Sequence, residues 1–106
     1  MPSQGLAPLV LMADGDDLSR EAREAQLRAA GLRISIARTG FEAIVKASCQ
    51  VPDIILLDGS LTGIDTEETM RLLTTCPMTA HIPVVRLLRG RRLPQRILSR
   101  LRRVAA

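Results

Sequence analysis

Residues 52–58, Pro-Asp-Ile-Ile-Leu-Leu-Asp, are the stretch that decides the fold. Four consecutive apolar residues, Ile54 to Leu57, lie between turn-forming residues, a pattern typical of a parallel strand that is buried on both faces. Such a strand needs helices above and below it. The stretch therefore predicts a central strand of an α/β domain, with Asp58 at its carboxyl end.

Segments typical of strands and of helices alternate on both sides of this central segment. Leu9–Met12 and Ile34–Ile36 are expected to be strands before it, and Val84 is expected to begin a fourth strand that reaches Leu88. An alternation of strands and helices with short connections is typical of βαβ units. The sequence therefore predicts an α/β fold of three layers, in which a parallel sheet of about four strands lies between helices.

Capping residues predict where the helices begin. Asp17 is expected to cap the first helix, Thr39-Gly40 to open the second, and Asp65 to cap the third. Phe41, the single aromatic residue, is expected in the core. The first helix has an apolar stripe at helical spacing, expected to face the sheet. This stripe consists of Leu18, Ala22, Ala25 and Ala29.

Length and composition predict one globular domain over residues 1–106. Apolar residues make up 46% of the chain, which is enough for a core. No apolar run approaches the roughly 18 residues of a membrane helix, and the first residues lack the pattern of a signal peptide. Cys49 and Cys76 lack metal-ligand spacing, so free thiols and a cytoplasmic location are expected.

Acidic residues follow two of the predicted strands. Asp14 and Asp16 come after the first strand, and Asp58 ends the third. The carboxyl ends of parallel strands meet at one edge of a sheet, so these carboxylates are expected to lie close together. Clustered carboxylates repel one another unless a cation joins them, and oxygen ligands suit Mg²⁺.

In their order and spacing, these segments resemble the CheY-like receiver domains of bacterial response regulators. The resemblance runs from about Pro8 to Pro83, and it implies a flavodoxin-like strand order and a role in two-component, phosphorelay signalling, not as an enzyme. The segments that carry it are Leu9–Asp14, Leu27–Gly31, Thr39–Ala43, Pro52–Asp58, Gly63–Asp65 and Ala80–Val84.

The resemblance implies that Asp58 is the phosphoacceptor, to which a histidine kinase would donate a phosphoryl group. It also implies that Mg²⁺ would be held by Asp58, by an acidic pair after the first strand, and by the carbonyl group of Ser60. Asp14 is the first member of that pair, but Gly15 stands in place of the second. Asp16, one residue further on, is the candidate substitute.

Two further departures weaken the phosphorylation chemistry that the resemblance implies. Leu88 stands where the family has a hydroxyl residue after the fourth strand, and the lysine of the fifth strand has no counterpart. Each missing group would stabilise the charge of a phosphorylated Asp58. Weak or absent phosphorylation is therefore expected, although a phosphorylatable response regulator stays an alternative.

The last 21 residues carry a net positive charge, whereas the rest of the chain carries a net negative one. Residues 86–106 contain eight arginines and no acidic residue, whereas residues 1–85 contain 7 basic and 11 acidic residues. The resemblance implies that this arginine-rich segment replaces the fourth helix, fifth strand and last helix of a receiver, with an amphipathic helix at Leu93–Val104. An absent fifth strand would expose a sheet edge, so a homodimer formed by that edge or by a swapped last helix is expected.

Guanidinium groups bind phosphates and stack on bases, so the arginine-rich segment predicts an anionic ligand. It is similar to arginine-rich CheY-like proteins that bind cyclic di-GMP. The alternative partner is a signalling protein, such as a kinase or a motor or effector component. A nucleic-acid-binding adaptor is disfavoured because Tyr and Trp are absent, and a merely solvated helix face stays open. The candidate ligand-binding residues are Arg86, Arg89, Arg91, Arg92 and Arg96.

Overall fold

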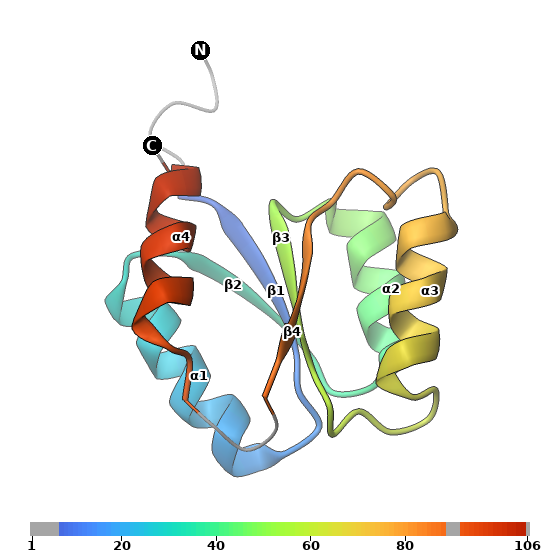
Figure 1. Cartoon of the computed structure of the whole chain (residues 1–106), viewed down its shortest axis with the longest axis horizontal. Helices are drawn as coiled ribbons and strands as arrows, with labels where there is room; N and C mark the ends of the chain where they lie inside the picture. The colour runs from blue at the N-terminus through green and yellow to red at the C-terminus, as the bar shows by residue number, and fades with distance from the viewer. Residues whose placement is uncertain (1–6, 89–91, 106) are drawn as a thin grey trace.

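The computed structural model of the chain describes residues 7–88 and 92–105, where strands and helices alternate as predicted (Figure 1). The sheet is parallel and has the strand order β2-β1-β3-β4. The predicted three-layer α/β fold with about four strands is therefore confirmed. The elements are β1 (Leu9–Ala13), α1 (Asp17–Ala29), β2 (Arg33–Ala37), α2 (Gly40–Gln50), β3 (Ile54–Asp58), α3 (Thr66–Thr75), β4 (Val84–Leu87) and α4 (Gln95–Ala105).

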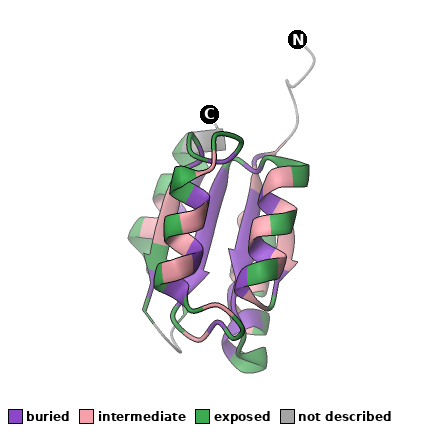
Figure 2. Ribbon diagram, turned by 90° about the vertical axis from the view of Figure 1, so that its right-hand side faces the viewer, coloured by how far each residue is buried: buried purple, intermediate pink, exposed green. Residues whose placement is uncertain are grey.

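The central strand β3 separates two apolar layers, since all five of its residues are buried. Ile54 and Leu56 face a core shared with α1 and α4, whereas Ile55 and Leu57 face one shared with α2 and α3. Figure 1 shows the same division, with α1 and α4 on one side of the sheet and α2 and α3 on the other. Figure 2 shows buried strands behind helices whose outer faces are exposed.

Helix α1 differs from its prediction in both its cap and its buried face. Asp16, not Asp17, is the cap, and its carboxylate accepts a hydrogen bond of 3.0 Å from the Ser19 backbone N–H. The alanine-rich stripe is not the buried face, and Leu18 is 79% exposed. The buried residues of α1 are Ser19, Arg20, Arg23 and Leu27, because the polar members of this face have partners at the sheet edge.

The starts of α2 and α3 are as predicted. The side chains of Thr39 and Asp65 each cap their helix by accepting a backbone hydrogen bond, of 3.1 Å and 2.8 Å. The prediction that Phe41 lies in the core is wrong, since this side chain is 63% exposed. Helix α2 turns Gly40 inward, and successive residues of a helix point about 100° apart, so Phe41 faces outward.

The C-terminal helix α4 packs on the same sheet face as α1. Leu98 and Leu101 of the predicted amphipathic helix are buried in the shared core. The amide group of Gln26 in α1 both donates to and accepts from the backbone of Leu93, at 3.1 Å and 2.7 Å, and so ties the start of the C-terminal segment to α1. The edge of β4 away from β3 has no partner strand within the described residues, and self-association through it stays a prediction. None of the described helices is long and apolar enough to cross a membrane.

Helices α2 and α3 approach each other closely at Gly40. A Cβ atom added there would lie 2.9 Å from the carbonyl oxygen of Ile64 and would overlap the hydroxyl group of Thr69. That hydroxyl group donates to the backbone carbonyl of Asp65 at 2.8 Å, so it is not free to move away. Only glycine fits at this position without displacing α3.

We expect Gly40→Ala to lower the free energy of unfolding by about 1–3 kcal/mol, because the overlap outweighs the better helix propensity of alanine. Urea denaturation followed by circular dichroism measures this change. Gly59→Ala is the matched control, since a Cβ atom at Gly59 meets nothing within 4 Å. Equal unfolding midpoints for the two variants would show that the α2–α3 approach is not tight.

Candidate functional site

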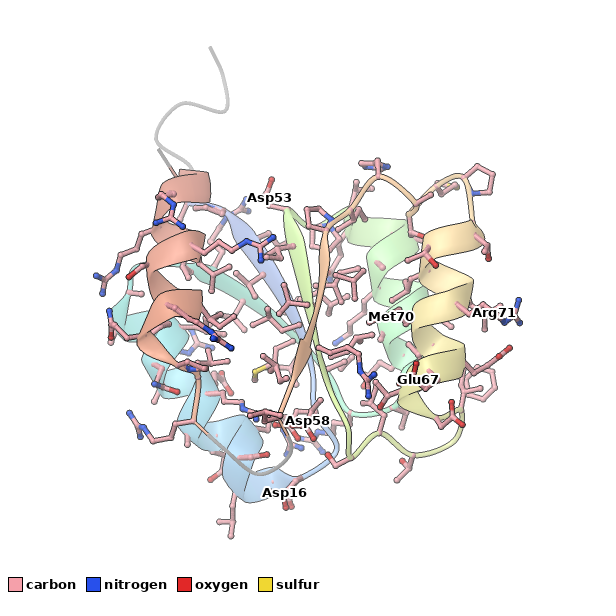
Figure 3. All side chains as sticks on the ribbon, in the orientation of Figure 1. Asp16, Asp53, Asp58, Glu67, Met70 and Arg71 are labelled. Carbon is pink, nitrogen blue, oxygen red and sulfur yellow. The ribbon has the colours of Figure 1, made fainter. Side chains whose placement is uncertain are left out.

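The acidic residues after β1 and β3 meet at the carboxyl edge of the sheet. The two strands pair in parallel with Ala13 opposite Leu57, so Asp14 and Asp58 are the next residues along neighbouring strands. Both are fully buried. Figure 3 shows Asp58 and Asp16 at this end of the sheet, with Asp53 at the opposite end. The predicted meeting of Asp14 and Asp58 therefore occurs, and these two residues form the centre of the candidate site.

A single arginine of α1 joins the two carboxylates. Arg23 is 1% exposed, and its Nη1 lies 3.0 Å from Oδ2 of Asp14 and 2.5 Å from Oδ1 of Asp58. Its Nη2 donates to the backbone carbonyl of Leu88 at 2.5 Å. One guanidinium group thus links both acids to the residue that follows β4.

Neutral donors complete the hydrogen bonds of the two carboxylates. The hydroxyl group of Ser19 donates to Asp14 at 2.7 Å, and the backbone N–H of Asp16 donates to its other oxygen at 2.9 Å. Ser60 donates its N–H to Asp58 at 2.8 Å and its hydroxyl group to Asp14 at 3.3 Å. All four carboxylate oxygens therefore have a donor, and no buried polar side-chain atom in the described residues lacks a partner.

The loop between β1 and α1 is fixed by Arg20. This side chain is 6% exposed, donates to the backbone carbonyl of Asp14 at 3.2 Å, and forms an ion pair with Asp17. The hydrogen bond from Arg20 holds the pKa of Asp17 below its usual value, with a smaller contribution from the charge itself. Asp17 is exposed, so its main effect is to orient Arg20.

The four candidate metal ligands do not all lie together. Asp14, Asp58 and Ser60 are in contact, whereas the carboxylate of Asp16 caps α1 and does not join them. A side chain at Gly15 has no room, since its Cβ atom would lie 2.8 Å from the backbone carbonyl oxygen of Ser60. Backbone atoms, and not a movable side chain, therefore exclude a second acid at this position.

The residues present do not fit Mg²⁺ as they stand. A divalent cation needs the oxygens that Nη1 of Arg23 already contacts, and it would lie beside a fixed positive charge. Within residues 7–88 and 92–105, no three His, Cys, Asp or Glu side chains gather in a way that could hold a metal ion. The chemistry of the site is that of a buried, hydrogen-bonded ion cluster.

Three of the five candidate ligand-binding arginines lie together at the junction of β4 and α4. Arg86, Arg92 and Arg96 line an open pocket of ≈ 380 Å³, solvent at its mouth included. Arg86 pairs with Glu67 at 2.5 Å, whereas Arg92 and Arg96 have no ion pair within the described residues. The other two candidates, Arg89 and Arg91, lie outside the described residues. The remaining lining residues are Arg23, Leu88, Pro94 and Ile97.

Sequence reasoning missed Arg23 and Ser19 as members of the site. The signal was present, because Ser19, Arg23 and Leu27 follow one another at a spacing of four residues and so share a helix face. The alanine-rich stripe of the same helix was preferred as the buried face, because its apolar composition is the more usual one for such a face. The acids that make a buried arginine favourable lie elsewhere in the chain.

The comparisons with known proteins find similarity to response regulators and to receiver domains. No protein-family model matches it. It is 38% identical over 76 residues to response regulator PleD from Caulobacter vibrioides, an alignment that covers 72% of this chain and 17% of PleD. The chain therefore corresponds to a small part of that relative.

Two solved structures show the same fold at low sequence identity. The receiver domain of the sensor histidine kinase PA1611 from Pseudomonas aeruginosa, determined with a magnesium ion coordinated in its active site cleft, has a TM-score of 0.81 at 20% identity, over 94% of this chain and 99% of that one. Chemotaxis response regulator CheY4 of Vibrio cholerae has a TM-score of 0.79 at 20% identity, over 92% and 98%. The chain therefore has the fold of CheY-like receiver domains, and over 76 residues it is similar in sequence to part of a response regulator.

Proposed function

We propose that this chain is a receiver domain that signals by binding an anionic partner at its C-terminal arginines, and not by accepting a phosphoryl group. The observation that carries the proposal is the arginine-lined pocket, in which Arg92 and Arg96 have no acidic partner within the described residues. Two guanidinium groups that face one pocket repel each other, and an anion between them relieves that repulsion. The pocket is therefore complementary in charge to a phosphate or a carboxylate.

The position of α4 adds to this complementarity. Arg96 belongs to the first turn of α4, and Pro94 accepts the backbone hydrogen bonds that begin the helix, from Ile97 at 3.0 Å and from Leu98 at 3.2 Å. The N-terminal end of a helix carries a partial positive charge. This charge acts in the same direction as the arginine side chains, so both favour an anion at the start of α4.

The pocket also has an apolar part. Leu88 is 71% exposed, and Pro94 and Ile97 line the pocket beside it. An inorganic ion would leave these surfaces in water, whereas a nucleotide would cover them with its base. A ligand that combines phosphate with a flat ring, such as cyclic di-GMP, uses both parts of the pocket. An acidic, partly apolar segment of a signalling protein has the same complementarity.

A phosphorylatable regulator is the second candidate function. Asp58 is at the carboxyl end of β3, next to a second buried acid, as the resemblance to receivers implies for a phosphoacceptor. The guanidinium group of Arg23 opposes this function, because it holds the oxygen atoms that an incoming phosphoryl group and its metal ion would need.

We expect cyclic di-GMP to bind the full chain with micromolar affinity at a stoichiometry of one site per chain, and GTP and single-stranded DNA to bind more weakly. The double variant Arg92→Ala/Arg96→Ala is expected to weaken this binding at least about tenfold, since each charged hydrogen bond contributes about 1.5–3 kcal/mol. Isothermal titration calorimetry measures both the affinity and the stoichiometry.

Arg103→Ala is the matched control, because Arg103 is an exposed arginine of α4 that does not line the pocket. An equal loss of affinity in this control would indicate general electrostatic attraction and not a site. If the chain binds none of the three ligands, a protein partner becomes the candidate, and the nucleotide part of the proposal is wrong.

We expect no acyl phosphate on Asp58 after incubation with acetyl phosphate and Mg²⁺, because Arg23 is bonded to the carboxylate that would react. Intact-protein mass spectrometry measures the added phosphoryl mass, and Asp58→Asn provides the blank. A robust, Mg²⁺-dependent gain of one phosphoryl group in the wild type, absent from Asp58→Asn, would establish the second candidate function instead.

A further inference from the structure

The position of Nη1 of Arg23 between two carboxylates suggests a role beyond that of an ordinary salt bridge. A single nitrogen atom lies within hydrogen-bond distance of acids from two different strands, Asp14 after β1 and Asp58 at the end of β3. All three side chains are shielded from water, with exposures of 1%, 0% and 0%. The contact therefore occurs in the interior, where solvent screens charges least.

The charges of the cluster depend on one another. Two buried carboxylates on neighbouring strands repel each other, and neither is stable in the interior without a cation. The guanidinium group supplies a single positive charge, and the donors of Ser19 and Ser60 and the N–H of Asp16 bond the remaining lone pairs. A buried arginine without these acids would be equally unfavourable.

The Nη2 atom of Arg23 connects the acidic cluster to the arginine-lined pocket. Nη2 of Arg23 donates to the carbonyl group of Leu88, the residue that follows β4. Both residues also line the arginine-lined pocket. Arg23 therefore joins three segments at the carboxyl edge of the sheet: the end of β1, the end of β3 and the end of β4.

The geometry assigns to Arg23 the role of the resident cation of the acidic cluster, in place of a divalent metal ion. The guanidinium group offsets one of the two negative charges of Asp14 and Asp58, holds the end of β4, and excludes Mg²⁺ from the carboxylate oxygens. Removing it leaves two buried acids and the nearby Ser60 facing one empty position, and these oxygen ligands suit Mg²⁺ or Mn²⁺. This inference does not depend on which ligand the C-terminal arginines bind.

The test is a comparison of Arg23→Gln with Arg28→Gln in the full chain. Arg28 is on the same helix but is exposed and pairs with Glu24, so its removal controls for the substitution itself. The thermal midpoint of each protein is measured in EDTA and in 5 mM Mg²⁺ or Mn²⁺. We expect the wild type and Arg28→Gln to melt at the same temperature under all conditions. We expect Arg23→Gln to melt at least ~5 °C lower in EDTA and to regain much of this loss with either metal ion.

Binding of Mn²⁺ to the wild type, followed by electron paramagnetic resonance, keeps the inference testable even if Arg23→Gln does not fold. The inference requires that the wild type binds no stoichiometric Mn²⁺ at millimolar concentration. Stoichiometric binding that Asp58→Asn removes would overturn it, because the metal ion and Arg23 would then occupy the cluster together. A midpoint of Arg23→Gln that equals that of Arg28→Gln would overturn it as well.

Discussion

The contact of one guanidinium group with two buried carboxylates determines how the elements at the carboxyl edge of this domain are arranged. The leucines and isoleucines of the two apolar layers supply most of the stabilisation, and Leu27 is the member that α1 contributes. Arg23 further fixes the rotation of α1, because it is the side chain of this helix that bonds both Asp14 and Asp58, whereas Arg28 is exposed. The polar inner face of that helix, the position of Ser19 and the attachment of the chain after β4 all follow from the same requirement.

Most of the fold was predictable from local patterns that agree with one another. The apolar run of β3, the Thr39 cap and the Asp65 cap each depend on a few neighbouring residues, and all three are confirmed. The orientation of α1 was not predictable in this way. Its sequence offers an alanine-rich face and a polar face, and helical spacing alone does not say which one meets the sheet. The outward position of Phe41 has a similar cause, since it depends on the close approach at Gly40, one residue away.

The candidate site, like the fold, contains some contacts that the sequence predicts and others that depend on residues far apart in the chain. The meeting of Asp14 and Asp58 follows from topology, because parallel neighbouring strands bring their carboxyl ends together. The contact between Arg23 and Asp58 joins residues 35 positions apart and depends on the rotation of a helix, which a linear pattern does not contain. The arginine-rich segment was recognisable from composition, but the pocket at the β4–α4 junction requires the folded chain. Composition therefore indicated a positive charge near the C-terminus, whereas the pocket that three of these arginines line is visible only in the folded structure.

The tight packing of Gly15 limits which substitutions could add a third acid to the cluster. A second acid at this position meets the backbone of Ser60, so an acid there does not restore a metal site while the loop keeps its present path. Loss of Arg23 alone leaves two acids buried without a counter-ion. A third acid in this loop therefore needs a change of the loop path as well as the loss of Arg23, because neither change alone opens a place for it.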